Sequence, residues 1–172
     1  MQKKWRAGIV GATGMVGQRF ATLLDNHPYF DVTVLAASPR SAGKSYSEAV
    51  EGRWKMSVPV PSYAADMTVI SATDIDTLKQ NCDFVFCAVD MKKDEIRALE
   101  ERYAKAEIPV VSNNSAHRAT PDVPMVIPEI NDDHLQVIES QRKRLGTKKG
   151  FIAVKPNCSI QCYVPMLTAL LP

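Results

Sequence analysis

Three glycines spaced three residues apart stand near the start of the chain, in residues 11–17 (GATGMVG). The short apolar run at 6–10 precedes them, and residues 15–25 follow with apolar side chains at helical spacing. A glycine-rich turn between a strand and a helix lets the backbone approach a pyrophosphate at the positive end of the helix dipole. The segment therefore predicts a strand, a turn and a helix that together bind a dinucleotide.

The rest of the chain continues this alternation of apolar runs and helical patterns. We expect further strands at 32–37, 84–89, 109–112 and 151–154, and further helices at 92–106, 132–143 and 159–171. Residues 38–67 carry three prolines among polar residues and are predicted to be a loop with at most a short extended piece. Strands joined by crossover helices pair in parallel, so the fold class is α/β with a Rossmann-like doubly wound parallel sheet.

Helical spacing also predicts which side chains face the core. The expected inward residues are Val16, Phe20, Leu23 and Leu24 in the first helix, and Ile96, Leu99 and Tyr103 in the helix at 92–106. Prolines at 121–128 mark a crossing between structural parts. We expect a nucleotide-binding domain at 1–131, and at 132–172 the truncated beginning of a second, α+β catalytic and dimerisation domain.

Composition excludes several classes of function. The 21 basic and 19 acidic residues are spread along the chain without the basic stripe that nucleic-acid binding requires. No apolar run approaches the roughly 18 residues that a membrane span needs. The four cysteines are too few for a disulfide scaffold and predict free thiols in a reducing, cytoplasmic compartment. We expect no nucleic-acid partner and no membrane partner.

The residues after the second predicted strand favour NADP over NAD. NAD-specific domains carry an acidic residue about 20 positions beyond the turn, where this chain has Ala36 and Ala37. Hydroxyl and guanidinium groups follow instead and suit a 2′-phosphate, although Arg40 and Lys44 as solvated loop charges remain an alternative. The expected cofactor-binding residues are Gly11, Thr13, Gly14, Met15, Val16, Gly17, Ser38, Arg40 and Ser41.

Cys158 follows a predicted strand and opens a predicted helix. Free backbone amides and the helix dipole favour the thiolate there, and Asn157 adds a side-chain donor for an oxyanion. A thiol combined with a nicotinamide oxidises an aldehyde through a thiohemiacetal and a thioester. Burial as a small apolar residue is the alternative, as is a metal pair with Cys162. No second ligand pair accompanies Cys162, so no metal is expected, and Cys82 and Cys87 are predicted to pack in the core.

Five segments together resemble the aspartate-semialdehyde dehydrogenase family, specifically its branch in archaea, fungi and some bacteria. They occur in family order and cover nearly the whole chain: 11–17 (GATGMVG), 38–41 (SPRS), 112–118 (SNNSAHR), 126–131 (VIPEIN) and 156–161 (PNCSIQ). The resemblance implies NADP-dependent, phosphate-dependent interconversion of aspartate semialdehyde and aspartyl phosphate, on the route to lysine, threonine, methionine and isoleucine. It further implies that Cys158 forms the thioacyl intermediate, that Asn157 orients the acyl group, and that Arg118 and Asn114 bind phosphate or substrate.

The chain departs from this family in length. Family members are about twice as long, and their later half supplies the general-base histidine, a carboxylate-binding arginine and most of a homodimer or homotetramer interface. The histidines here, His27, His117 and His134, all precede Cys158. We therefore expect the N-terminal half of such an enzyme, truncated, cleaved or separately encoded. Malonyl-CoA reductase is a close alternative, and a non-catalytic NADP-binding module is one of a different class.

Overall fold

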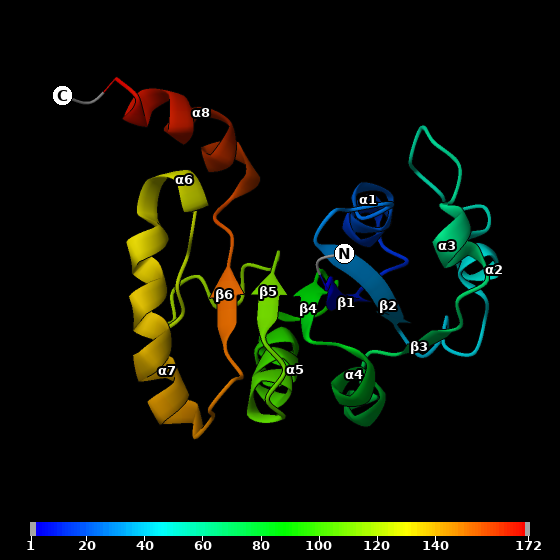
Figure 1. The fold of residues 1–172 in the computed structure, drawn as a ribbon, viewed down its shortest axis with the longest axis horizontal. Coiled ribbons are helices and arrows are strands. Elements are labelled where there is room, and N and C mark those ends of the chain that lie inside the picture. The colour runs from blue at the N-terminus through cyan, green and yellow to red at the C-terminus, as the bar shows by residue number, and fades with distance from the viewer. Residues whose placement is uncertain (1–2, 171–172) are drawn as a thin grey trace. The chain divides into compact units, whose positions relative to one another are not determined.

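A computed structural model of the chain describes residues 3–170, which divide between Met91 and Lys92 into two units. The strands of the first unit are β1 (Trp5–Val10), β2 (Phe30–Ala37), β3 (Val69–Ser71) and β4 (Phe84–Cys87). They are parallel and lie in the order β3-β2-β1-β4, the order of the first half of a Rossmann sheet (Figure 1). The predicted Rossmann-like parallel sheet is confirmed.

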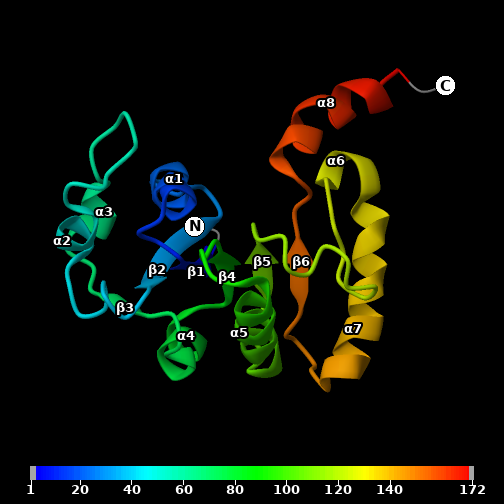
Figure 2. The ribbon, with the colours of Figure 1, turned by 180° about the vertical axis from the view of Figure 1, so that it is seen from behind.

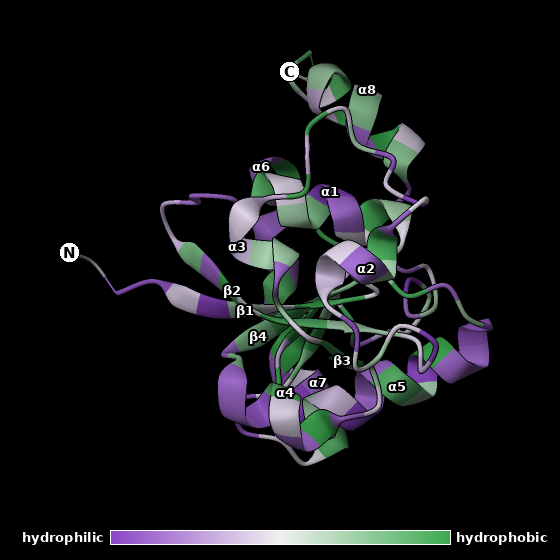
Figure 3. Ribbon diagram, turned by 90° about the vertical axis from the view of Figure 1, so that its right-hand side faces the viewer, coloured by the Kyte–Doolittle hydropathy of each residue, from purple (hydrophilic) through white to green (hydrophobic). Residues whose placement is uncertain are grey.

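Helices cover both faces of this sheet. Within the first unit, α1 (Met15–Leu23) lies on one face and α4 (Ile75–Asn81) on the other (Figure 3). The carboxyl ends of parallel strands meet at one sheet edge, so the segments after β1 and β2 are neighbours there. The register supports this placement, because Val10 pairs with both Ala36 of β2 and Cys87 of β4.

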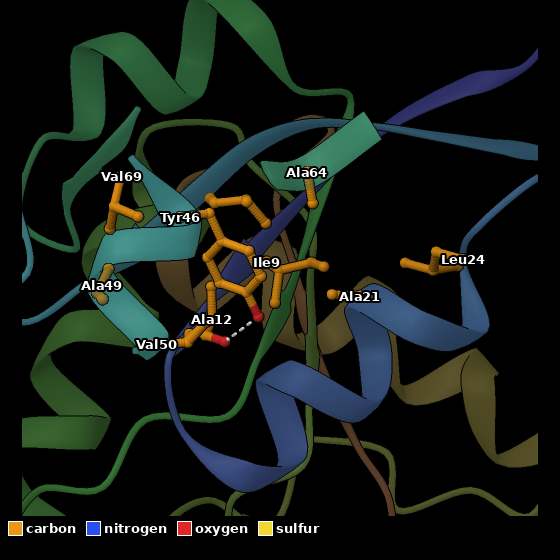
Figure 4. Packing of buried hydrophobic residues seen from close by; sticks show 11 residues of the cluster. Ile9, Ala12, Ala21, Leu24, Tyr46, Ala49, Val50, Ala64 and Val69 are labelled. Carbon is orange, nitrogen blue, oxygen red and sulfur yellow. Dashed lines mark hydrogen bonds between the residues drawn. The ribbon is translucent and has the colours of Figure 1, made fainter. Parts of the chain in front are cut away.

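The core between α1, the sheet and the following helices is a cluster of small and aliphatic residues around one tyrosine (Figure 4). Tyr46 is completely buried in this cluster, and its hydroxyl donates to the carbonyl of Ala12 at 2.9 Å. The cluster consists of Ile9, Ala12, Ala21, Leu24, Leu35, Ala37, Tyr46, Ala49, Val50, Ala64 and Val69.

The expected inward face of α1 is wrong in part. Val16 and Leu23 are 37% and 55% exposed, whereas Gly17, Gln18 and Ala21 are buried. Gly17 is buried because the helix approaches its own turn so closely there that only glycine fits, and Gln18 is buried because its side chain bonds to the main chain of Thr13, Arg53 and Lys55. In the second unit, by contrast, Ile96, Leu99 and Tyr103 are buried as predicted.

The predicted loop at 38–67 contains two short helices, α2 (Tyr46–Val50) and α3 (Ser62–Ala65). A capping box stabilises the start of α2, because Ser45 accepts from the Glu48 amide and the Glu48 carboxylate accepts from the Ser45 amide. The expectation of a plain loop is therefore wrong here.

β3 and α4, which follow this stretch, were also not predicted. Asp74 caps α4 by accepting from the Thr77 amide at 3.1 Å.

The second unit contains two parallel strands, β5 (Val110–Ser112) and β6 (Ile152–Val154), seen side by side from front and back (Figures 1 and 2). Its helices are α5 (Lys93–Lys105), α6 (Pro128–Asn131), the 3₁₀ helix η1 (Asp132–Val137), α7 (Ile138–Leu145) and α8 (Cys158–Thr168). The helix expected at 132–143 thus begins as 3₁₀ and ends at Gly146, whose φ is +71°. The domain boundary near Asn131 stays a prediction.

Arg144 and Asp122 form a two-point ion pair in this unit, with Nη2 to Oδ1 at 2.9 Å. The hydrogen bond from Arg144 lowers the pKa of Asp122, so the stabilisation is present above the unfolded pKa and is lost as pH falls through the folded one. Arg144 keeps 40% of its side chain in solvent, so we expect Arg144→Gln to lower the unfolding free energy by only about 0.5 to 1 kcal/mol at neutral pH.

Urea titrations measure this loss. The deficit of Arg144→Gln should shrink as pH falls through the folded pKa of Asp122, which lies below its ordinary value, and should vanish once this carboxyl is protonated in the folded state. Lys143→Gln, which removes an exposed charge from the same helix, should match the parent at neutral and at acidic pH. An equal deficit in both variants, or a deficit of Arg144→Gln that survives in acid, would contradict the assignment.

No residue of α8 within the described chain is buried. Tyr163, Met166, Leu167 and the following Leu170 are exposed, Leu170 at 80%. Leu171, the last residue of the helix expected at 159–171, lies outside the described residues. Apolar surface of this kind favours association, so we expect a purified polypeptide of residues 1–172 to pair or aggregate at micromolar concentration. Light scattering measures this, with Leu167→Lys expected to reduce it, and a monodisperse parent monomer would contradict it.

Candidate functional site: a nucleotide turn and an open thiol

The turn between β1 and α1 requires glycine at two of its three glycine positions. Gly11 has a φ of +87°, and a Cβ there would lie 2.3 Å from the carbonyl oxygen of Ala88. A Cβ on Gly17 would lie 2.2 Å from the oxygen of Gly11. Gly14 has a φ of −77° and would meet that oxygen only at 3.4 Å. The backbone is therefore packed tightly at both ends of the turn and is open in the middle.

The open middle of the turn presents the N-terminus of α1. Gly14 is the N-cap and supplies no side-chain acceptor to the helix. The amides of Met15, Val16 and Gly17 belong to the first helical turn and lack intrahelical acceptors, as in every α-helix. Gly14, Met15 and Val16 are exposed. These residues fit a pyrophosphate, because the missing Cβ atoms leave the backbone accessible to an anion.

The candidate 2′-phosphate residues follow β2, at the same sheet edge. Ser38 and Arg40 are exposed, while Ser41 is only 3% exposed. The Ser41 amide donates to the carbonyl of Ser38 at 2.9 Å and closes a tight turn around Arg40. Arg40 is therefore exposed on a loop that follows β2, and Ser41 shapes this loop.

The thiol of Cys158 stands at the first position of α8 and is exposed. Asn157 is the N-cap, and its Oδ1 accepts from the Ser159 amide at 2.9 Å and from the Cys158 thiol at 3.7 Å. The side-chain oxygen of Asn157 thus caps α8, and the side-chain nitrogen Nδ2 can donate to another group. The structure places the thiol at a helix N-terminus, as the sequence predicts, and leaves the Cys158 side chain exposed among residues 3–170.

Arg118 joins the loop before this thiol to the segment after β5. Its Nε donates to the carbonyl of Lys155 at 3.1 Å, and its Nη2 donates to the carbonyl of Pro156 at 3.2 Å. Its Nη1 has no hydrogen-bond acceptor among residues 3–170. The structure therefore brings Arg118 to the chain segment that carries Cys158, with one guanidinium nitrogen left to bind an anion.

Asn114 lies in a buried polar cluster that the sequence analysis missed. Glu100 of α5 is completely buried, and its Oε1 accepts from Ser112 Oγ at 2.5 Å and from Asn114 Nδ2 at 2.9 Å. Its Oε2 lies 4.0 Å from Nε2 of His117, which is also buried. Helical spacing from Ile96 and Tyr103 places Glu100 on the buried face, and this was the available signal.

The other three cysteines differ in their burial. Cys82 and Cys87 are buried as predicted, and burial raises the pKa of Cys82 to about 11. Cys162 is exposed, and its Sγ donates to the Cys158 carbonyl at 3.4 Å. Across residues 3–170, no three His, Cys, Asp or Glu side chains gather as metal ligands. Within the same range, no helix combines the length and apolar character needed to cross a membrane.

The first unit is of the nucleotide-binding α/β class, and the second carries an open thiol at a helix start. The family model "Semialdehyde dehydrogenase, NAD binding domain" matches residues 6–138. The chain belongs to the semialdehyde dehydrogenase family.

Curated relatives and a solved structure agree with this membership. The chain is 42% identical over 168 residues to the aspartate-semialdehyde dehydrogenase of Archaeoglobus fulgidus, covering 98% of this chain and 47% of the relative. It is 43% identical over 165 residues to that of Schizosaccharomyces pombe, covering 96% and 44%. The crystal structure of the Candida albicans enzyme with NADP matches with a TM-score of 0.85 at 38% identity, covering 98% and 47%. The chain thus spans less than half the length of these relatives.

Proposed function

We propose that the chain carries the NADP-binding and thiol-bearing part of an aspartate-semialdehyde dehydrogenase. The enzyme would interconvert aspartate semialdehyde and aspartyl phosphate, in the cytoplasm, on the route to lysine, threonine, methionine and isoleucine. The observation that carries this proposal is the bonding of Arg118 to the two carbonyls just before Asn157 and Cys158. It puts an anion-binding group beside a nucleophile, as a phosphate-dependent thiol enzyme requires.

The oxidative direction begins with the thiolate of Cys158, which attacks the aldehyde carbon and forms a carbon–sulfur bond. The carbonyl oxygen becomes an oxyanion, and two groups donate to it: the Asn157 side-chain amide nitrogen and the backbone amide of Cys158. The next amides of α8, those of Ser159 and Ile160, already donate to Asn157. A bound nicotinamide supplies the acceptor for the hydride that leaves this carbon. The thiohemiacetal thereby becomes a thioester on Cys158.

Phosphate completes the reaction. One of its oxygens attacks the thioester carbon, the carbon–sulfur bond breaks, and Cys158 leaves as a thiolate. Arg118 binds the phosphate through Nη1, while Nε and Nη2 keep their hydrogen bonds to the carbonyls of Lys155 and Pro156 before Cys158. Asn114 orients the segment that carries Arg118 through its bond to Glu100. We further propose that the working enzyme is a homodimer or homotetramer.

The preference for NADP depends on Arg40 in this proposal. We expect Arg40→Ala to weaken NADPH binding about tenfold, because a charge-assisted hydrogen bond to the 2′-phosphate is lost, and to leave NADH binding unchanged. Calorimetric titration of both nucleotides measures this. Lys79→Ala, which removes an exposed charge from α4, is the control and should change neither affinity. Equal losses for NADPH and NADH in Arg40→Ala would contradict the assignment.

Substrate choice is tested by comparing two acyl donors. NADPH oxidation with aspartyl phosphate, or the reverse reaction that needs phosphate, supports the proposal. Oxidation driven by malonyl-CoA and indifferent to phosphate would replace it with a malonyl-CoA reductase.

A further inference from the structure

The hydroxyl of Tyr46 reaches the glycine-rich turn from inside the core. Tyr46 is completely buried at the start of α2, and its Oη donates to the carbonyl oxygen of Ala12 at 2.9 Å (Figure 4). Burial raises the pKa of this phenol, so it remains a neutral donor. The position lies in the stretch that the sequence analysis treated as a loop, and nothing in the mechanism above uses it.

This bond orients one particular peptide of the turn. In a trans peptide the N–H of the following residue points opposite to the carbonyl. Because the Ala12 carbonyl is drawn into the core, the Thr13 N–H is directed away from it. The amides of Gly11 and Ala12 donate to the Ala36 carbonyl and that of Gly14 donates to Gly11. Within residues 3–170, the Thr13 amide has no acceptor.

Gln18 holds the next carbonyl of the turn in the same way. Its Nε2 donates at 3.0 Å both to the carbonyl of Thr13 and to that of Arg53, and its Oε1 accepts from the Lys55 amide at 2.8 Å. Gln18 is 1% exposed, so these bonds are shielded from water. Two consecutive carbonyls of the turn are therefore held by buried side chains.

We propose that Tyr46 is a positioning residue for the nucleotide pyrophosphate. It holds the Ala12–Thr13 peptide in the orientation in which the Thr13 amide donates to a pyrophosphate oxygen, and Gln18 holds the adjoining peptide. This inference rests on the proposed function, since it requires that the turn bind a dinucleotide. It assigns a specific binding role to a side chain that never touches the ligand.

The chain offers a matched control for Tyr46. Tyr63, a half-buried residue, also donates its hydroxyl to a main-chain carbonyl, that of Ala21 at 2.8 Å, in the last turn of α1 and away from the glycine-rich turn. Tyr46→Phe and Tyr63→Phe each leave one carbonyl of the same strand–turn–helix unit without its donor. Both should therefore lose stability, Tyr46→Phe at least as much as Tyr63→Phe because its carbonyl is the more deeply buried, and only Tyr46→Phe should lose nucleotide affinity.

Calorimetric titration with NADPH and with NADH, well below the unfolding temperature, is the test. We expect Tyr46→Phe to weaken both nucleotides by the same factor of about ten, because they share the pyrophosphate, and Tyr63→Phe to stay within about twofold of the parent. Gln18→Met should weaken both nucleotides as Tyr46→Phe does. Thermal unfolding of each variant, measured in parallel, reports the structural loss.

The outcomes separate the two proposals. A parent that binds NADPH, with Tyr46→Phe indistinguishable from Tyr63→Phe, would overturn the positioning role and leave the proposed function intact. A loss confined to NADPH would also overturn it, because the 2′-phosphate would then be the affected group. A folded parent that binds neither nucleotide would overturn the proposed function and this inference with it.

Discussion

Cys158→Ser is expected to reduce turnover at least about a thousandfold while leaving NADPH affinity within about twofold of the parent. A serine hydroxyl at this position is far less ionised than a thiol and attacks the aldehyde carbon poorly. The glycine-rich turn at residues 11–17 belongs to the first unit and Cys158 to the second, so the geometry of the turn does not depend on the Cys158 sulfur. Turnover, and mass spectrometry of the acylated protein, measure the first effect, and calorimetry measures the second.

Cys162→Ser is the matched control for this experiment. It makes the same substitution in the same helix, one turn later, at another exposed thiol. We expect turnover close to that of the parent and acylation still confined to Cys158. Equal turnover of Cys158→Ser and the parent would show that Cys158 is not the nucleophile, and nucleotide binding without turnover or acylation in either protein would indicate a binding module. Loss of activity in both variants would instead indicate that α8 itself had been disturbed.

Gly17→Ala is expected to lower the unfolding free energy by about 3 kcal/mol and to weaken nucleotide binding at least about tenfold. The added Cβ would lie 2.2 Å from the Gly11 oxygen and 2.6 Å from the Ala12 Cα. Both atoms belong to the backbone of the turn, so relief requires α1 to move away from it. Urea unfolding and NADPH titration measure the two effects.

Gly14→Ala is the control within the same turn. Its φ of −77° suits any residue, and the nearest atom to a Cβ is the Gly11 oxygen at 3.4 Å. We expect stability within about 0.5 kcal/mol of the parent, the usual range for a substitution that meets no such obstacle. A fall in the unfolding free energy of Gly14→Ala as large as that of Gly17→Ala would contradict the steric account of the turn.

The sequence predicted the elements that carry a repeating signal. The glycine-rich turn, the parallel alternation and the buried face of α5 all follow from local spacing, and each is confirmed. The buried face of α1 was predicted only in part: Leu24 lies in the core and Phe20 packs against it, but hydrophobicity alone also put Val16 and Leu23 inside. Close approach to the turn selects glycine at position 17, and Ala21 packs in the core cluster around Tyr46.

The missed elements are short and depend on contacts far along the chain. α2 and α3 are too short to show helical periodicity, and the capping pair Ser45 and Glu48 was the only local sign of α2. The site residues likewise divide into those with a local sequence signal and those without one. Cys158 and Asn157 could be found from a strand followed by a helix start, but the Arg118 bond to Lys155 joins residues 37 positions apart. No local pattern encodes such a pair.

Formation of NADPH from NADP⁺ and aspartate semialdehyde, with and without phosphate, tests the central claim most directly. The protein should be purified as cells make it and compared with its Cys158→Ser variant. The account predicts NADPH formation that requires phosphate and is lost with the thiol. Formation that ignores phosphate, or that persists in Cys158→Ser, would contradict it.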